Sequence, residues 1–332
     1  MSRQHEHEGP EADRGYRLLR LDDYRELVSL DALFKAGSPI SPESRNRVVD
    51  DLLETLAPEG ASRRLGLRPE AIERLKRDPE QARRLLRAFL TVRGPEPLLE
   101  SFNLMLDGLL QLELQERGQV ELPSLTRIRD LLPESSYPAL PYCALWRGDI
   151  TRLSVDAIVN AANSRMLGCF VPFHACIDNA IHSTAGPRLR EDCDRIMRLQ
   201  GGPEPTGGAK ATRGYNLPAR FVLHTVGPIV EKELTEAHEK ALASCYISCL
   251  DLASRLPDVH SVAFCAISTG VFGYPKLPAA LVALQTVSEW LRAHPGSLDL
   301  VVFNVFGDED LAVYQVALEK WDSASCVRRT KQ

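Results

Sequence analysis

Two cysteines and one histidine lie within eight positions near the middle of the chain, at Cys169, His174 and Cys176. Thiolate sulfur and imidazole nitrogen are ligands that zinc prefers in proteins. Three protein ligands leave the fourth position of a tetrahedral zinc ion open, which is the arrangement of catalytic zinc sites. The spacing alone also allows a second interpretation, because free cysteines are commonly small buried hydrophobic residues and a nearby histidine can be an ordinary core residue.

The residues around this group favour the metal interpretation. Gly168 precedes the first cysteine, Pro172 lies between the ligands, and the segment Asn160-Ala-Ala-Asn163 lies just upstream. Residues 148–186 contain, in order, GDIT, VDAIVNAAN, LGCF, PFHACID and NAIHSTAG. This stretch resembles the zinc-containing macrodomains, a family of ADP-ribosyl hydrolases.

The resemblance is specific at the two cysteines. An ordinary macrodomain has a run of glycines followed by Val-Asp-Gly-x-Ile-His after its Asn-Ala-Ala-Asn segment. This chain keeps the end of that pattern from Ile177 to His182 and replaces the glycine run by Cys-Phe-Val-Pro-Phe-His-Ala-Cys. This replacement is typical of the zinc-containing branch of the family. The resemblance covers roughly residues 141–322 and weakens before them.

The fold implied by the resemblance is a three-layer α/β/α macrodomain with a mixed central sheet, preceded by an α-helical N-terminal extension. The sequence pattern agrees, since short apolar runs alternate with helical periods at 233–255, 278–293 and 310–321. Continuous apolar runs fit strands covered on both faces, and ligands of such sheets collect at the carboxyl ends of the strands. The runs are CALWRGD, DAIVNAA, RFVLHTVG, VAFCAI and DLVVFNVF.

We expect four segments along the chain. Residues 1–15 form a disordered polar tail, 16–118 a helical extension, 119–140 a proline-containing linker and 141–332 the macrodomain with its zinc site. In the extension, Ser41 and Asp78 precede prolines and apolar stripes, which predicts helix starts at both. The stripes offer no chemistry, so we expect the extension to pack on or guard the macrodomain.

Composition argues against a nucleic-acid-binding protein, a small disulfide-stabilised protein and a membrane protein. The net charge of −5 provides no broad cationic field for nucleic acid. The eight cysteines are dispersed over 332 residues, unlike those of a small disulfide scaffold. No apolar run approaches the roughly 18 to 20 residues that span a membrane, and the N-terminus lacks the apolar core of a secretory signal. We therefore expect a cytoplasmic protein without a membrane partner.

The resemblance assigns an ADP-ribose site to the carboxyl ends of the strands. Asp149 accepts a hydrogen bond from the adenine amino group, the Ile150 backbone supports the ring, and Asn163 lies near the distal ribose. From the residues alone, a turn or helix-cap role is favoured for Asp149, and an ordinary turn for the glycine loop after VAFCAI. The assigned ligand residues are Asp149, Ile150, Asn163, Ser268, Thr269, Gly270, Val271, Phe272, Gly273, Asn304 and Phe306.

Several other candidates favour structural roles. His224 lies in an apolar run and is expected to be a buried, hydrogen-bonded histidine. Cys245 and Cys249 share a helix face without an accompanying histidine, so core packing is preferred for both. Cys193 and Cys265 receive the same interpretation. His182, one turn after Asp178, is expected to orient the structure.

The function implied by the resemblance is zinc-dependent removal of mono-ADP-ribose from protein side chains linked through oxygen. Cleavage of the C1–O bond should pass through an oxocarbenium-like state. The expected catalytic set is Asn163, Asp178, Cys169, His174 and Cys176, with one Zn²⁺ per chain. Zinc could polarise a ribose oxygen or activate water, and both roles are open. Asp178 matches the acidic position of ordinary macrodomains as base, ribose ligand or loop support.

Two other functions remain alternatives at this stage. One is a non-catalytic ADP-ribose-binding module with a structural zinc ion, and the other is an O-acetyl-ADP-ribose deacetylase that uses the same pocket. The resemblance also implies a partner, because zinc-containing macrodomains are associated with reversal of modification by a sirtuin-type ADP-ribosyltransferase.

Overall fold

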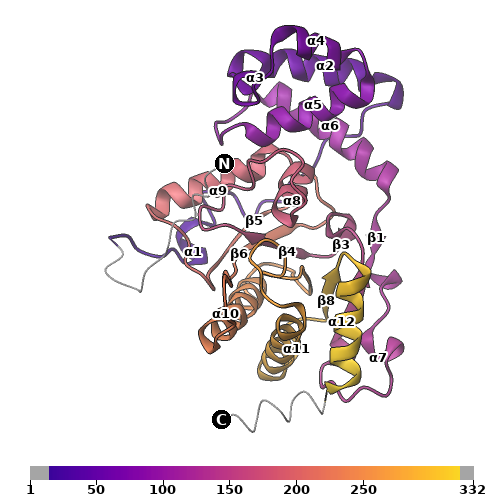
Figure 1. Cartoon of the computed structure of the whole chain (residues 1–332), viewed down its shortest axis with the longest axis vertical. Coiled ribbons are helices and arrows are strands. Elements are labelled where there is room, and N and C mark those ends of the chain that lie inside the picture. Colours follow the sequence, from indigo (N-terminus) through magenta and orange to yellow (C-terminus); the bar gives the residue numbers. More distant parts are fainter. Residues whose placement is uncertain (1–14, 322–332) are drawn as a thin grey trace.

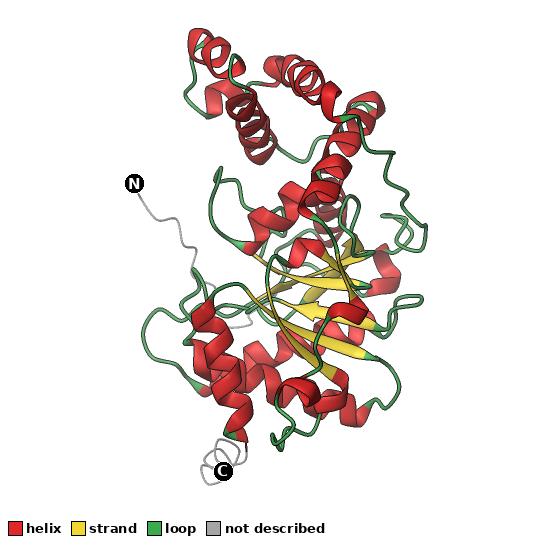
Figure 2. Cartoon of the chain, turned by 90° about the vertical axis from the view of Figure 1, so that its right-hand side faces the viewer, coloured by secondary structure: helices red, strands yellow, loops and turns green. Residues whose placement is uncertain are grey.

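The structure, a computed structural model, describes residues 15–321. The tail that the sequence predicts for residues 1–15 therefore lies, apart from Gly15, outside the described residues, as do residues 322–332. The described chain has a group of short helices at one end and a layered unit that contains the sheet (Figure 1, Figure 2). None of the described helices combines the length and apolar character needed to cross a membrane.

Six strands form the main sheet, in the order β2-β8-β7-β4-β6-β5. Every neighbouring pair is parallel except β5 and β6, so the sheet is mixed, as predicted. All residues of β6, β7 and β8 are buried, which requires cover on both faces. The strands are β2 (Cys143–Arg147), β4 (Ala157–Ala162), β5 (Ala209–Arg213), β6 (Phe221–Val226), β7 (Ser261–Phe264) and β8 (Leu300–Val305).

Helices provide this cover on both sides. Figure 1 shows α8 and α9 above the strands and α10, α11 and α12 below them. The resulting three layers confirm the predicted α/β/α architecture. The helices are α8 (Ile177–Ala185), α9 (Pro187–Gln200), α10 (Glu236–Ala253), α11 (Lys276–Ala293) and α12 (Asp308–Glu319).

The helical unit precedes this layered unit and has a hydrophobic core of its own. Leu52, Leu86, Phe89, Phe102 and Leu109 are each at most 1% exposed and pack in one cluster that is separate from the core around the sheet. The helical character predicted for this region is therefore confirmed. Its helices are α2 (Arg45–Leu56), α3 (Ala61–Arg64), α4 (Pro69–Lys76), α5 (Pro79–Val92) and α6 (Glu100–Arg117).

The two predicted helix starts differ in the structure. Asp78 caps α5, since its carboxylate accepts hydrogen bonds from the backbone N–H groups of Glu80 and Gln81 at 2.9 and 3.0 Å. Ser41 does not cap α2 with its side chain, because the chain first forms a 3₁₀ turn over Pro42–Ser44. The Ser41 hydroxyl instead lies 3.1 Å from the Ser44 hydroxyl.

Segments on either side of the helical unit pack on the layered unit. Tyr24 is 1% exposed, and its hydroxyl accepts a hydrogen bond from the N–H of Ala211 at 2.9 Å. In the expected linker, Ile128 and Tyr137 belong to the core around the sheet. We therefore propose that the helical unit proper spans residues 40–118. The remaining short elements are α1 (Leu21–Tyr24), β1 (Val120–Glu121), α7 (Ile128–Leu131) and β3 (Leu153–Ser154), with β1 parallel to β3.

Two arginines of α9 join the two units. The Arg188 guanidinium lies 2.5 Å from the Asp107 carboxylate of α6, and the side chain of Asp107 is 5% exposed. Arg190 donates hydrogen bonds to the backbone carbonyls of Leu90 and Arg93 at 3.1 and 2.6 Å. Asp107 also accepts a hydrogen bond from Asn216 at 2.7 Å. The interface is thus held by polar contacts of the buried Asp107 and Arg190.

Replacement of Arg188 by alanine should lower the free energy of unfolding by about 3 kcal/mol, because it leaves the buried Asp107 carboxylate without its cation. Urea unfolding followed by circular dichroism measures this loss. Arg45→Ala is the matched control, since the ion pair of Arg45 with Glu116 is half-exposed and its removal should cost less than about 1 kcal/mol. Equal losses in the two variants would contradict the assignment.

Candidate metal centre and nucleotide cleft

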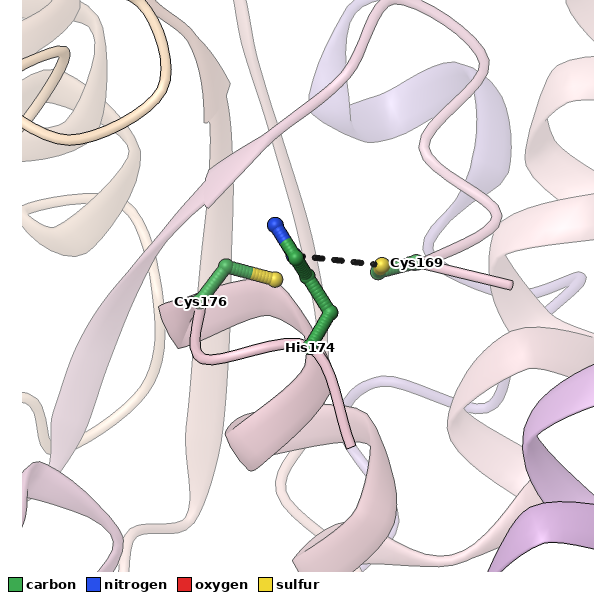
Figure 3. Close-up of side chains that lie close together, drawn as sticks. All are labelled: Cys169, His174 and Cys176. Carbon is green, nitrogen blue, oxygen red and sulfur yellow. Dashed lines mark hydrogen bonds between the residues drawn. The ribbon is translucent and has the colours of Figure 1, made fainter. Parts of the chain in front are cut away.

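Cys169, His174 and Cys176 converge in the loop between β4 and α8. Their ligand atoms all lie within 4.8 Å of one another, and the Sγ of Cys169 is 3.7 Å from the Nδ1 of His174. Figure 3 shows the two sulfur atoms on either side of the His174 ring. Ligands that share one tetrahedral zinc ion at ~2.0–2.3 Å lie at most about 4 Å apart. The donor set, and the 3.7 Å between Cys169 and His174, therefore fit one zinc ion.

The shape of this loop depends on a glycine. Gly168 has a φ of +82°, and a Cβ at this position would lie 2.9 Å from the His182 ring. Asn163 donates a hydrogen bond from Nδ2 to the Gly168 carbonyl at 3.2 Å, which anchors the start of the loop. At the other end, Cys176 caps α8, because its Sγ accepts a hydrogen bond from the N–H of Asn179 at 3.4 Å.

The two thiols of the loop are coupled. A hydrogen bond from the Cys176 thiol lowers the pKa of Cys169 to about 5, and this effect outweighs the opposing effect of partial burial. The same bond raises the pKa of Cys176. One thiolate is thus favoured at neutral pH, and thiolate is the form that binds metal ions.

Asp178 lies beneath this loop, on the first turn of α8. Its carboxylate accepts a hydrogen bond from Asn160 at 2.8 Å and lies 3.4 Å from the Nε2 of His182. Only 6% of Asp178 is exposed, and burial raises the pKa of its carboxyl to about 6. The structure thus brings Asp178 next to the metal loop but turns its carboxylate toward the sheet.

His224 of β6 is fully buried, as the sequence predicts for it. Its Nδ1 accepts a hydrogen bond from Asn160 at 3.1 Å, and its Nε2 lies 2.9 Å from the Thr212 hydroxyl. His182, Cys193 and His224 form a second close group of metal-ligand types within the described residues. Because both His224 nitrogens already have hydrogen-bond partners and the group is buried, we assign it to the core.

Asp149 follows β2 and begins a short 3₁₀ turn, Ile150–Arg152. One carboxylate oxygen accepts hydrogen bonds from the Thr151 N–H at 3.0 Å and the Thr151 hydroxyl at 2.7 Å. The helix-cap interpretation of Asp149 is therefore correct. The other oxygen lies 3.5 Å from Arg117 Nη1 of the helical unit and is available to a further donor.

The remaining nucleotide candidates gather at the same edge of the sheet. Strands β2, β8, β7 and β4 are parallel, so their carboxyl ends meet there. Asn304 of β8 donates a hydrogen bond to the Gly148 carbonyl at 2.9 Å beside Asp149, and Phe306 is 81% exposed. These residues and Asn163, just after β4, line one edge of the layered unit.

The loop at 268–273 connects β7 to α11 at this edge. Ser268 has a φ of +64° and Gly273 a φ of +68°, and a Cβ on Gly270 would meet nothing within 4 Å. The Ser268 hydroxyl is buried without a hydrogen-bond partner in the described part of the chain, whereas Val271 is 68% exposed. Such a loop presents backbone N–H groups to a bound anion.

Two arginines of the helical unit are site neighbours that the sequence did not reveal. Arg117 of α6 contacts Asp149 and donates a hydrogen bond to the Thr151 hydroxyl at 3.2 Å. Arg87 of α5 donates a hydrogen bond to the Oδ1 of Asn179 at 3.1 Å. A small cavity of about 30 Å³ lies between α5, α6 and α8, and Cys169 lines it. No sequence signal identifies either arginine, because Arg87 is one of several arginines on α5 and Arg117 ends α6 outside any motif.

Comparison with known proteins identifies the family. Residues 159–283 match the Macro domain family. The chain is 46% identical over 237 residues to a protein named protein-ADP-ribose hydrolase from Treponema medium, an alignment that covers 71% of this chain and 87% of that protein. This chain belongs to the macrodomain family. A Staphylococcus aureus protein-ADP-ribose hydrolase is 43% identical to this macrodomain, with 71% and 84% of the two chains covered.

Solved structures agree with this family. A Trypanosoma brucei macrodomain in complex with ADP-ribose is 33% identical to this macrodomain, with a TM-score of 0.53 over 69% of this chain and 94% of that one. The same organism's macrodomain in complex with ADP is 39% identical, with a TM-score of 0.50 over 60% and 76% of the two chains. The predicted macrodomain fold is thus confirmed.

The exposure of the cysteines gives a direct test of the loop geometry. In chelator-treated protein, iodoacetamide should label Cys169 and Cys176 before the other cysteines of residues 15–321. Both are partly exposed, whereas Cys143, Cys193, Cys245, Cys249 and Cys265 are buried. Peptide mass spectrometry over a time course measures the order of labelling. Labelling of Cys193 or Cys265 as fast as that of Cys169 would refute the described loop.

Proposed function

We propose that this macrodomain is a protein-ADP-ribose hydrolase that uses one zinc ion, held by Cys169, His174 and Cys176, to remove mono-ADP-ribose from side chains linked through oxygen. The observation that carries the proposal is the convergence of these three ligand atoms within 4.8 Å at the strand edge that also carries the nucleotide candidates. The names of the Treponema and Staphylococcus relatives support the same reaction.

The adenosine end of the substrate would bind around β2 and β8. The free carboxylate oxygen of Asp149 can accept a hydrogen bond from the adenine amino group, and the Ile150 backbone follows directly. Asn304 supports this turn through the Gly148 carbonyl. The exposed ring of Phe306 is suited to lie against the base, since aromatic rings stack on flat apolar surfaces.

The diphosphate would bind at the loop formed by Ser268, Thr269, Gly270, Val271, Phe272 and Gly273. Positive φ at Ser268 and Gly273 turns the backbone tightly, and the open space at Gly270 lets a phosphate approach the N–H groups. Phe272 then lies at the distal ribose. Asn163, whose amide anchors Gly168, lies between the cleft and the metal loop and is the candidate contact to that ribose.

The bond to be broken joins C1 of the distal ribose to the oxygen of the modified side chain, and its cleavage develops positive charge on the sugar. When bound, zinc would supply a Lewis acid for a ribose or leaving-group oxygen. Asp178 is buried and hydrogen-bonded to Asn160, which favours a role in orienting α8 and the loop over direct contact with water. We therefore assign Asp178 as a positioning residue.

We also propose a cytoplasmic location and a sirtuin-type ADP-ribosyltransferase as the source of the modified protein. Thiolate ligands require a reducing compartment, which supports the location. The transferase rests on the family resemblance of residues 148–186.

Replacement of both Cys169 and Cys176 by alanine should abolish zinc binding and lower turnover of a mono-ADP-ribosylated protein by about 100-fold or more, because zinc provides several kcal/mol of transition-state stabilisation. Elemental analysis measures the zinc, and release of labelled ADP-ribose measures turnover. ADP-ribose affinity, measured by calorimetry, should stay within a few-fold of the parent value.

Cys249→Ala is the control for this experiment, since Cys249 is a buried cysteine of α10 that lies outside the loop. It should keep both zinc and turnover. Full turnover in the double variant, or in parent protein after verified zinc removal, would defeat the metal proposal. ADP-ribose binding without turnover in the parent protein would identify a binding module instead.

The linkage is tested with substrates modified on serine, aspartate or arginine. We expect release from oxygen-linked serine or aspartate and none from arginine, because a zinc centre with an open position can polarise a leaving-group oxygen, whereas a guanidinium offers no lone pair to the metal. Mass spectrometry of the acceptor peptides measures the release. O-acetyl-ADP-ribose in a parallel reaction reveals deacetylation, and cleavage of the arginine-linked substrate alone would contradict the proposed specificity.

A further inference from the structure

The loop that carries the three ligands has few anchors. Cys169 and Cys176 are partly exposed and His174 is exposed, so hydrophobic burial does little to fix them. Asn179 supplies two of the anchors. Its backbone N–H donates to the Sγ of Cys176 at 3.4 Å, and its Nδ2 donates to the carbonyl of Val171 at 3.0 Å. One residue therefore fixes both a ligand sulfur and the middle of the loop.

The second of these bonds depends on how the Asn179 amide is oriented. An amide can present either its oxygen or its nitrogen to a given neighbour, and only the nitrogen can donate to the Val171 carbonyl. On the other side of the amide, Arg87 Nη2 donates to Oδ1 at 3.1 Å. The Ser183 hydroxyl also donates to Oδ1, at 3.3 Å, but a hydroxyl can equally accept a hydrogen bond. A guanidinium has donors and no acceptor, so Arg87 selects the orientation in which Oδ1 faces Arg87 and Nδ2 faces the loop.

The neutral amide of Asn179 is the side chain to which Arg87 bonds in the described part of the chain. No ion pair of Arg87 occurs there, and its Nε is buried without a hydrogen-bond partner. Arg83, one turn earlier on α5, contacts Glu113 through two hydrogen bonds of 2.5 and 2.8 Å within the helical unit. The charge of Arg83 is therefore neutralised, whereas Arg87 forms no ion pair in the described part of the chain. Both side chains line the cavity that Cys169 also lines.

Arg87 is also not needed to join the two units. The buried pair of Arg188 with Asp107 and the hydrogen bonds of Arg190 to the Leu90 and Arg93 carbonyls already do this. The Arg87 side chain thus makes one specific polar contact across the interface, with Asn179, and Asn179 is the residue that anchors the loop.

We propose that Arg87 of the helical unit is a positioning residue for the metal loop, acting through the Asn179 amide. This inference rests on the proposed function, in which that loop holds zinc. The helical unit would then contribute to the site itself and not only cover it.

The test compares the full-length Arg87→Ala, Arg87→Lys and Arg83→Ala variants. Residues that orient metal ligands typically change metal affinity by about 10- to 100-fold, so Arg87→Ala should release zinc to a chromophoric chelator about tenfold faster than the parent. Arg87→Lys keeps a donor-only cation and should recover part of this loss. Arg83→Ala should match the parent, and thermal unfolding of all variants should show that the fold is retained.

Amide hydrogen exchange of residues 168–176 in metal-free protein separates this inference from the proposed function. Exchange there should be faster in Arg87→Ala and unchanged in Arg83→Ala, whether or not the protein uses zinc. If the parent carries no zinc but the loop still loosens, the proposed function fails and the positioning role stands. Equal exchange and equal zinc release in Arg87→Ala and the parent overturn the positioning role.

Discussion

The loop between β4 and α8 has to hold three ligand side chains in contact with solvent, without a hydrophobic core of its own. Burial of apolar area, which stabilises the rest of the fold, acts weakly on partly exposed side chains. The position of the ligands therefore depends on backbone geometry and hydrogen bonds. Gly168 allows a left-handed turn against the His182 ring, and Asn163 and Asn179 bond to loop carbonyls. Any residue that bonds to Asn163, Gly168 or Asn179 therefore affects the position of the ligands.

A buried polar chain connects the loop to the sheet. It runs from Thr212 on β5 through His224 on β6 and Asn160 on β4 to Asp178 on α8. Polar groups without access to water must bond to one another, so this chain fixes α8 relative to three strands. Since α8 begins directly after Cys176, the sheet sets the position of one metal ligand. The buried Asp178 thus has a clear structural task, whatever its effect on the chemistry.

The sequence predicted site residues well where those residues lie close together in the chain. Cys169, His174 and Cys176 are close in the chain, so any compact loop brings them together, and Asp149 meets the sheet edge because it follows a predicted strand. The sequence was uninformative for contacts between distant segments. Arg87 lies 92 positions from Asn179 in the chain. The sequence of its own helix does not distinguish Arg87 from Arg83 or Arg84. Residues around Tyr24 look helical and apolar, but only the folded chain shows that they pack on the sheet unit.

Arg117 and Arg87 give the helical unit a contact at each end of the site, one at Asp149 and one at Asn179. Such contacts can influence the site only if the two units keep a fixed relative position. The buried Arg188–Asp107 pair provides this constraint, because separating the units would expose a desolvated carboxylate and a guanidinium without their partners. The contacts of Arg117 and Arg87 with the site therefore depend on the same interface that stabilises the fold. Weakening this interface would therefore disturb the Asp149 carboxylate and the metal loop at the same time.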